Sequence, residues 1–183
     1  GLRFMPGQFA WITVRSSPFA DAEHPFSFSS SSEQTGCLTF TIKELGDFTR
    51  QIKTFQPGEK VYVDGPFGHF RLDRHPHARQ FGFIAGGVGI TPIMSMLRTL
   101  ADRGDPRPLI LIYANKDWDS VIFREELDDL QGRLNLKVVH VLQNPPEGWQ
   151  GEKGFVSQAV LHQHLPADRQ RNLMEVFICG PQP

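Results

Sequence analysis

Short runs of alternating apolar and polar residues, separated by glycine and proline, fill residues 1–76. β-branched and aromatic residues recur in these runs at a spacing of two, which is the period of a half-buried strand. Strands are therefore expected at residues 9–14, 24–29, 37–42 and 60–63. A short helix is expected at residues 47–53. Several short strands bounded by turn residues predict a small antiparallel β-barrel.

The pattern changes after residue 76, where apolar runs alternate with helical segments. The run at 109–113 has no polar alternation, as in strands that are buried on both faces. Helices are expected at 91–103, where apolar residues recur on one face, and at 120–130. Strands are expected at residues 81–85, 109–113, 136–142 and 174–179. This alternation of strands and helices predicts a parallel sheet that is covered on both faces.

We therefore predict two domains, one of the β class and one of the α/β class. Residues 1–76 are expected to form the small antiparallel β-barrel. Residues 77–183 are expected to form a doubly wound parallel α/β domain of the kind that binds nucleotides. The length of 183 residues suits two domains of this size.

Charge and composition narrow the function. The net charge is -1, so neither a nucleic-acid groove nor a polybasic membrane anchor is expected. The longest uncharged stretch, residues 81–97, is shorter than the ~20 residues of a membrane span and is broken by glycines. Cys37 and Cys179 lie far apart, which favours a reducing compartment. We expect a soluble, cytoplasmic module, and no metal site is expected because no histidine or cysteine spacing fits one.

The strongest chemical signal is the segment from Gly86 to Pro92, GGVGITP, which follows a buried strand and opens a helix. The glycines, which include Gly87 and Gly89, allow positive φ and let the backbone approach an anion closely. Thr91 is expected to cap the helix, and Pro92 suits its first turn. Free N–H groups and the positive end of the helix dipole would then face a pyrophosphate. The alternative is a tight strand–helix turn without a ligand.

Together with Phe177–Pro181, this segment resembles the nicotinamide-nucleotide domain of the ferredoxin–NADP reductase superfamily. Residues 24–27, HPFS, resemble its flavin motif in the form typical of ferric reductases and NADPH oxidases. Residues 46–49 resemble its second flavin motif, and residues 64–68 resemble the turn that closes its barrel. The five motifs occur in the expected order and cover nearly the whole chain. By the same resemblance, we expect a first barrel strand and a final helix to be missing from this chain.

The resemblance implies an FAD site on the first domain. The Phe26 ring would pack near the isoalloxazine ring, and the Ser27 hydroxyl would reach flavin N5, because a hydroxyl can donate or accept as that atom changes protonation. His24 stands where many relatives carry an arginine for the flavin phosphates, and Lys43 is either a further phosphate contact or a solvated strand end. A pyrophosphate contact at Thr49 favours FAD over FMN. The implied flavin contacts are His24, Pro25, Phe26, Ser27, Lys43, Gly46, Thr49, Gly65 and Phe67.

The resemblance also implies a nicotinamide dinucleotide site on the second domain. The Cys179 sulfur would lie close to nicotinamide C4, and we favour this over the alternative of a small buried apolar residue because Gly180 and Pro181 follow it. The implied dinucleotide contacts are Gly86, Gly87, Gly89, Thr91, Pro92, Asn115, Lys116, Arg124, Cys179, Gly180 and Pro181.

The choice between NADH and NADPH depends on the residues after the second strand of the parallel sheet. A basic residue there favours the 2′-phosphate of NADPH, whereas an acidic one favours the ribose hydroxyl of NADH. Lys116 therefore slightly favours NADPH, although Asp117 partly offsets it. Arg124 could reach the phosphate, or it could pair with Asp128 four residues later on a helix.

The resulting hypothesis is a reductase in which a hydride passes from NADPH or NADH to FAD, with Ser27 and Cys179 at the reacting atoms. The HPFS form implies that single electrons then pass to the haem of a membrane domain in the same parent protein, with the module on the cytoplasmic face and ferric iron or oxygen as final acceptor. One alternative is a soluble reductase that serves a ferredoxin, a flavodoxin or an oxygenase. A second alternative is a nucleotide-sensing module without catalysis.

Overall fold

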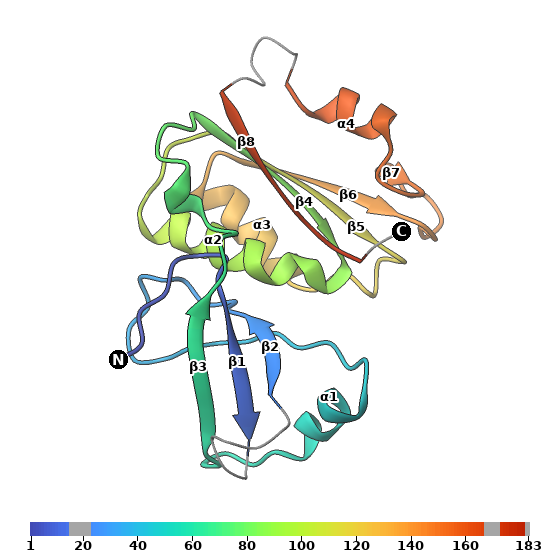
Figure 1. Ribbon diagram of the computed structural model, residues 1–183. Helices are drawn as coiled ribbons and strands as arrows, with labels where there is room; N and C mark the ends of the chain where they lie inside the picture. Colours follow the sequence, from blue (N-terminus) through green and yellow to red (C-terminus); the bar gives the residue numbers. More distant parts are fainter. Residues whose placement is uncertain (15–22, 167–172, 182–183) are drawn as a thin grey trace.

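A computed structural model describes residues 1–14, 23–166 and 173–181. Two lobes lie one above the other, as Figure 1 shows. We call residues 1–71 the antiparallel lobe and residues 80–181 the parallel lobe. A short 3-10 helix, η2 (Leu72–Arg74), stands between them.

The antiparallel lobe contains β1 (Phe9–Val14), β2 (His24–Ser27) and β3 (Val61–Phe67), in the order β2-β1-β3. Helix α1 (Asp47–Gln51) and the 3-10 helix η1 (Ile52–Thr54) precede β3. The register places Ser27, Phe9 and Phe67 in one row across the three strands. In Figure 1 this row lies at the end of the sheet that faces the parallel lobe.

The strand predicted at residues 37–42 is wrong as a regular strand, because only an isolated bridge forms there, between Phe28 and Phe40. Serine and threonine hydroxyls replace part of the expected ladder. The Thr39 N–H donates to Ser30 Oγ at 3.2 Å, and the Ser29 and Thr39 hydroxyls lie 3.2 Å apart. Hydroxyl groups that bond to nearby backbone compete with regular strand pairing, and the alternation of apolar residues does not reveal this competition.

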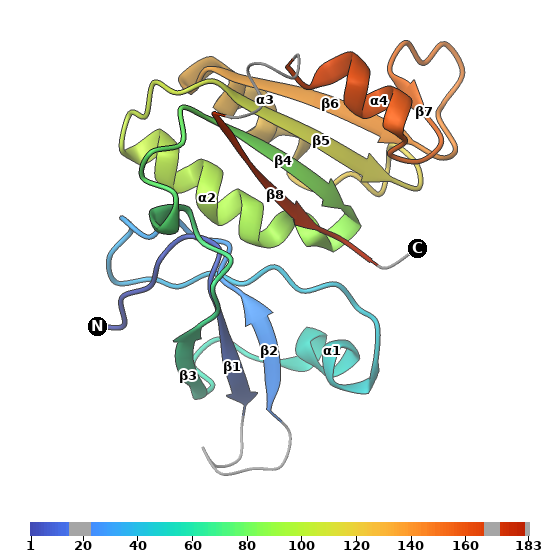
Figure 2. The same ribbon diagram turned by 45° about the horizontal axis from the view of Figure 1, so that its top comes forward.

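The parallel lobe has five parallel strands in the order β7-β6-β5-β4-β8, which confirms the predicted α/β class. Helices α2 (Ile90–Asp102) and α3 (Arg124–Arg133) cover one face, and α4 (Gln158–His164) covers the other, as Figure 2 shows. The strands are β4 (Gln80–Gly86), β5 (Leu109–Asn115), β6 (Leu136–Leu142), β7 (Glu152–Lys153) and β8 (Met174–Cys179).

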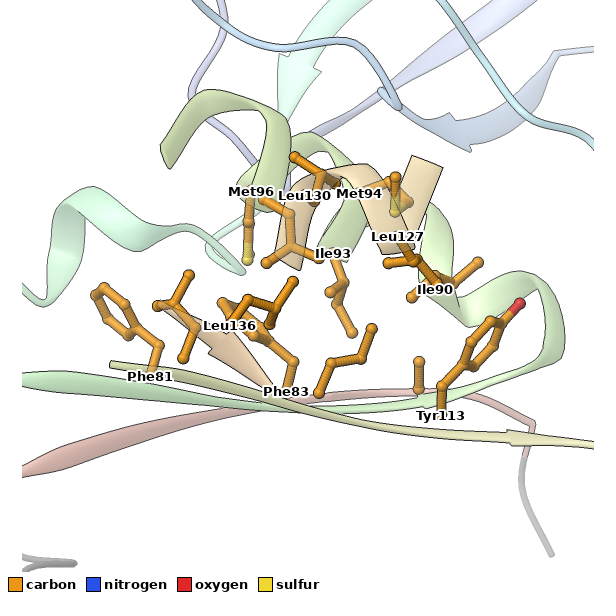
Figure 3. Packing of buried hydrophobic residues seen from close by; sticks show 14 of the residues in the cluster. Phe81, Phe83, Ile90, Ile93, Met94, Met96, Tyr113, Leu127, Leu130 and Leu136 are labelled. Atoms are coloured by element: carbon orange, nitrogen blue, oxygen red, sulfur yellow. The ribbon is translucent and has the colours of Figure 1, made fainter. Parts of the chain in front are cut away.

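The core follows the alternation of strand side chains. Leu111 and Tyr113 of β5 belong to the cluster under α2 and α3, whereas Ile110 and Ile112 pack with Val160 of α4. Figure 3 shows the first of these clusters, in which phenylalanine rings of β4 meet apolar side chains of the two helices. Both faces of β5 are therefore buried, as its unbroken apolar sequence predicted.

Two helices differ from the sequence prediction. α3 begins at Arg124 rather than at residue 120, because Ser120 and Asp117 form a turn and Phe123 adopts a left-handed conformation with φ 62°. A residue in that conformation interrupts a right-handed helix. α4 was not expected, and the Ser157 hydroxyl caps it by accepting from the Val160 N–H at 3.3 Å.

Candidate functional site

The glycine turn after β4 joins the sheet to α2 through the 3-10 helix η3 (Gly87–Gly89). Gly87 has a φ of 51°, and a Cβ built there would meet no atom within 4 Å. The backbone at Gly87 therefore faces open space, next to the amino end of a helix of 13 residues. This is the arrangement in which N–H groups and the helix dipole can bind an anion.

Gly86 and Gly89 pack against the chain that follows β8, and their approach to an anion stays a prediction. A Cβ at Gly89 would lie 2.3 Å from the Cys179 carbonyl oxygen, and one at Gly86 would lie 3.0 Å from Pro181 Cδ. A Cβ at Gly180 would in turn lie 3.1 Å from the Gly86 nitrogen. The turn after β4 and the chain after β8 thus fit together only because these positions lack side chains.

The prediction that Thr91 caps α2 is wrong. The helix begins at Ile90 and Gly89 is its N-cap residue, so Thr91 lies inside the first turn. The Thr91 hydroxyl donates to the Val88 carbonyl at 2.8 Å and is almost fully buried. Pro92 also lies in the first turn, where its missing N–H has no cost. The Thr91 hydroxyl therefore stabilises the glycine turn from within.

A cleft of about 940 Å³ runs along this turn and is lined by both lobes. Residues 41–43 of the antiparallel lobe face residues 84–88 and 178–181 of the parallel lobe across it. Eight residues that the sequence predicted as contacts line the cleft: Lys43, Gly86, Gly87, Asn115, Lys116, Cys179, Gly180 and Pro181. The other predicted contacts do not: His24, Pro25, Phe26, Ser27, Gly46, Thr49, Gly65, Phe67, Gly89, Thr91, Pro92 and Arg124.

Several cleft residues were missed by the sequence analysis. The Phe155 and Ile178 side chains are 72% and 66% exposed, although both are large and apolar. Gln143 directly follows β6. Ligands of open α/β sheets bind beyond the carboxyl ends of the strands, and this rule would have identified Gln143. The missed lining residues are Thr41, Ile42, Ile84, Ala85, Val88, Ala114, Ser120, Ile122, Gln143, Phe155, Val156 and Ile178.

Cys179 ends β8 and is half-buried in the cleft wall. Burial raises the pKa of its thiol, so the group is protonated and neutral at physiological pH. A neutral thiol beside an apolar wall suits contact with an uncharged ring better than nucleophilic chemistry, for which a thiolate is needed.

Tyr113 of β5 bonds to the glycine turn from the sheet side. Its hydroxyl donates to the Gly87 carbonyl at 3.2 Å, and burial raises the pKa of Tyr113 to about 12. Asn115, two residues later, is 5% exposed, and its backbone carbonyl accepts from the Gln143 N–H at 3.1 Å. The carboxyl ends of β5 and β6 are thereby held together beside the cleft.

Lys116 and Asp117, the two charged residues that follow β5, have different surroundings. Lys116 is exposed and lines the cleft, whereas the Asp117 carboxylate accepts from the Ser120 N–H at 2.9 Å in the turn before α3. The Arg124 guanidinium lies over the Trp118 ring, 5.3 Å from its centroid, instead of pairing with Asp128. Among the described residues of the parallel lobe, Lys116 is therefore the charged side chain that lines the cleft.

The predicted flavin motif forms the edge strand β2. Phe28 is the core residue, with its ring stacked on Phe4 at 4.2 Å, whereas Phe26 is only half-buried. Successive residues of a strand point to opposite faces, so Phe26 and Ser27 lie on different sides of the sheet. The His24 ring stacks on Phe48 at 3.8 Å. A planar ring that touches both Phe26 and Ser27 would lie across the edge of β2.

The Thr49 hydroxyl makes three hydrogen bonds at the start of α1. Its hydroxyl accepts from the Leu45 and Gly46 N–H groups at 2.8 and 2.9 Å and donates to the Gly46 carbonyl at 3.0 Å. These three bonds use the hydrogen-bonding capacity of a hydroxyl. The predicted contact of Thr49 with a pyrophosphate would have to replace one of them, so we assign the hydroxyl a structural role.

Phe67 shares the row of Ser27 and Phe9, and its ring centroid lies 6.0 Å from that of Phe9. Gly65 packs closely on β1, where an added Cβ would lie 3.0 Å from the Ala10 Cβ. The two predicted contacts on β3 therefore have different roles: Phe67 is 40% exposed and is separated from Ser27 by Phe9, and Gly65 permits close strand packing.

Hydrogen bonds connect the residues that follow the flavin motif to the cleft wall. Ser29, two residues after Ser27, donates its N–H to the Thr39 carbonyl at 2.8 Å. The Thr41 hydroxyl donates to Ser29 Oγ at 3.2 Å, and Thr41 lines the cleft. Figures 1 and 2 both show the carboxyl ends of β2 and β8 beside α2. The chain just after the flavin motif is thus bonded to the wall of the cleft that Cys179 also lines.

Two family models match the chain. The model described as an oxidoreductase NAD-binding domain matches residues 83–183. The model described as an FAD-binding domain matches residues 1–71. Among the residues that the structure describes, no group of histidine, cysteine and acidic side chains could hold a metal ion. No helix of the described chain has the length and apolar character needed to cross a membrane.

The chain is similar to curated reductases. NADH-cytochrome b5 reductase 1 of Bos taurus is 32% identical over 188 residues, which cover 87% of this chain and 61% of that protein. NADH-cytochrome b5 reductase 2 of Mycosarcoma maydis is 29% identical over 167 residues, which cover 89% of this chain and 47% of that protein. The chain therefore spans about half to three fifths of the length of these relatives.

Solved structures share the fold. The cytochrome b5 reductase domain of Ulva prolifera nitrate reductase matches with a TM-score of 0.83 and 23% identity, covering 100% of this chain and 77% of that one. A ferredoxin NADP+ reductase from Neisseria gonorrhoeae matches with a TM-score of 0.75 and 20% identity, covering 97% and 74% of the two chains. These matches confirm the predicted combination of an antiparallel lobe with a doubly wound parallel lobe.

A substitution that adds one methyl group tests the packing role of Gly89. Gly89→Ala should destabilise the protein by about 1–3 kcal/mol, because the new Cβ overlaps the Cys179 carbonyl. Gly132→Ala in α3 is the matched control: its Cβ meets no atom within 4 Å, so it should stabilise by about 0.5–1 kcal/mol. Denaturant unfolding measures both, and equal effects in the two variants would contradict the packing of the two segments.

Proposed function

The chain belongs to the ferredoxin–NADP reductase superfamily of FAD- and NAD-binding oxidoreductases, and we propose that it passes a hydride from NADH or NADPH to FAD and then single electrons to an acceptor. The observation that carries the proposal is the shared cleft. Residues 41–43 of the FAD-binding lobe face the glycine turn and the end of β8 on the NAD-binding lobe. Two rings held on opposite sides of one cleft can react directly.

The dinucleotide side of the cleft fits its proposed ligand. Open space above Gly87 and the amino end of α2 suit a pyrophosphate. Lys116 supplies a positive charge at one end, and the exposed Phe155 ring supplies an apolar surface on which a base can stack. Cys179 closes the other end with a neutral thiol.

The flavin side fits an isoalloxazine ring at the edge strand β2. Phe26 offers an aromatic face on one side of the sheet, and Ser27 offers a hydroxyl on the other. FAD, when bound, supplies a two-electron acceptor at N5 that can later release electrons one at a time. Lys43 is exposed, lines the cleft and can pair with a phosphate. The Thr49 hydroxyl is not assigned to the ligand.

The chain's own residues would orient the two reactants on opposite sides of the cleft. With both cofactors bound, a hydride (two electrons and one proton) would pass from nicotinamide C4 to flavin N5, the second proton of the reduced ring would come from solvent, and the dinucleotide would leave oxidised. No side chain has to remove a proton from carbon, which agrees with the neutral thiol at Cys179. Ile84, Ile122 and Ile178 give the cleft an apolar wall on which an uncharged ring can pack.

We propose that the one-electron acceptor is a haem protein. The curated relatives carry the name NADH-cytochrome b5 reductase, which names a haem protein as their acceptor. The HPFS sequence of β2 resembles the ferric reductase and NADPH oxidase form of the motif, in which the haem lies in a membrane domain of the same protein. Under this proposal the module works at the cytoplasmic face of that membrane.

Ser27 tests the flavin assignment. In FAD-loaded protein, Ser27→Ala should slow flavin reduction by NADH about tenfold, because one hydrogen bond of ~1.4 kcal/mol at the reacting atom is lost. Ser157→Ala, which removes the cap of α4 outside the cleft, is the control and should leave the rate unchanged. Single-turnover absorbance measures both. An unchanged rate in Ser27→Ala would refute the contact with N5.

Lys116 tests the choice of dinucleotide. We propose that NADPH is accepted as well as NADH, because Lys116 faces the cleft and the Asp117 carboxylate is held in a turn. Lys116→Glu should weaken NADPH binding about tenfold (~1.4 kcal/mol) and NADH binding much less. Lys153→Glu, outside the cleft lining, is the control. Equal losses for both dinucleotides in Lys116→Glu would remove the phosphate assignment.

A further inference from the structure

Helix α2 holds the antiparallel lobe through three polar side chains on one of its faces. Ser95, Arg98 and Thr99 have the spacing i, i+3 and i+4, so they neighbour one another on the helix surface. Each of them bonds to Ser29–Ser32 of the antiparallel lobe, a run of four serines that we call the serine segment. This run contains none of the residues assigned to the cleft chemistry, and its sequence alone indicated only a loop.

Each of the three contacts is specific. The Ser95 hydroxyl donates to the Ser30 carbonyl at 2.7 Å, and the Arg98 guanidinium donates to the Ser29 carbonyl. The N–H of the last serine donates to the Thr99 hydroxyl at 2.9 Å. Ser95 and Thr99 are fully buried. A buried polar group without a partner costs about 1–3 kcal/mol, so a shifted placement of the two lobes would be penalised several times over.

Arg98 joins three parts of the fold. Its Nε and Nη2 donate to the two carboxylate oxygens of Glu126 on α3, each at 2.6 Å. Its Nη1 donates to the serine segment, and its guanidinium lies 5.1 Å from the Phe123 ring centroid. The planar fork of arginine can make these bonds at once, whereas a lysine ammonium cannot reproduce their geometry.

These contacts connect the two reacting positions. The serine segment begins two residues after Ser27, and the Ser29 hydroxyl accepts from Thr41 in the cleft wall. α2 begins at the glycine turn that packs on the Cys179 carbonyl. Arg98 lies ~12 Å along the same rigid helix from its first residue. The separation between the flavin side and the dinucleotide side is therefore set through α2.

We propose that Arg98 is a positioning residue for hydride transfer. By holding Ser29 and Glu126 at the same time, it fixes the place of Ser27 relative to Cys179 across the cleft. The inference rests on the function proposed above. Hydride transfer requires close approach of two ring atoms, and a misplacement of ~1 Å can cost about 10²-fold in rate.

The test compares FAD-loaded Arg98→Met and Arg98→Lys with Arg103→Met. Arg103, the C-cap residue of α2, is the matched control, since it pairs with Glu33 of the antiparallel lobe but in an exposed ion pair of little energetic weight. Single-turnover reduction over a range of NADH concentrations separates the limiting rate from the dissociation constant. We expect the limiting rate to fall about 10–100-fold in Arg98→Met, less in Arg98→Lys, and not at all in Arg103→Met. The dissociation constant should stay within about threefold in all three.

A second readout does not depend on activity. Amide hydrogen exchange of residues 29–32 should become at least about tenfold faster in Arg98→Met and stay unchanged in Arg103→Met, because the serine segment loses a partner on α2 only in the former. If Arg98→Met fails to fold, Arg98→Lys carries the test. A wild-type limiting rate in a folded, FAD-loaded Arg98 variant would overturn the positioning role alone. A wild type whose bound flavin is reduced by neither NADH nor NADPH would overturn the proposed function as well.

Discussion

Burial of α2 between two lobes is the constraint on which the rest of the structure depends. The helix is covered by the parallel sheet through residues such as Ile93 and Leu97, and by the antiparallel lobe through Ser95 and Thr99. A helix buried on all sides must satisfy every polar side chain that it carries. It does so by bonding to backbone groups of the serine segment, and this gives the two lobes one mutual placement.

The same helix also places the site. Its first turn follows the glycine segment, and Gly89 lets that segment rest on the end of β8, where the Cys179 thiol lies. Gly87 remains open to the cleft, and Tyr113 fixes its carbonyl from the sheet side. The proposed anion site, the position of the thiol and the opposition of the two lobes therefore depend on one packed element rather than on separate loops.

The sequence predicted the elements whose patterns are set by burial. The strand at residues 9–14 has the predicted bounds, and the strand at 136–142 does as well, because apolar spacing reports directly which side chains meet the core. The predictions failed where side-chain hydrogen bonds, rather than burial, determine the local structure. The hydroxyls around Thr39 replace strand pairing, and the turn before Arg124 delays α3.

In the candidate site too, features set by backbone geometry were predicted, whereas those set by side-chain hydrogen bonds were not. Motif order located the glycine turn and the end of β8, since glycine and proline positions are tied to backbone geometry. The roles of individual hydroxyls were not accessible, because Thr91 and Thr49 could equally face a ligand or their own backbone, and they face the backbone. Contacts that join distant segments, such as Arg98 with Ser29 and Glu126, have no sequence pattern that indicates them.

We propose that a dihydronicotinamide on the parallel lobe and a flavin on the antiparallel lobe meet across the cleft between the two lobes, whose mutual placement α2 fixes. The most direct measurement is anaerobic stopped-flow reduction of the FAD-loaded chain by NADH and NADPH carrying deuterium at either face of C4. We expect flavin absorbance to be bleached in one phase, and we expect deuterium on one face of C4, but not on the other, to slow this phase by a primary isotope effect. Bleaching with no isotope effect from either face, or no bleaching of bound flavin, would contradict direct transfer across the cleft.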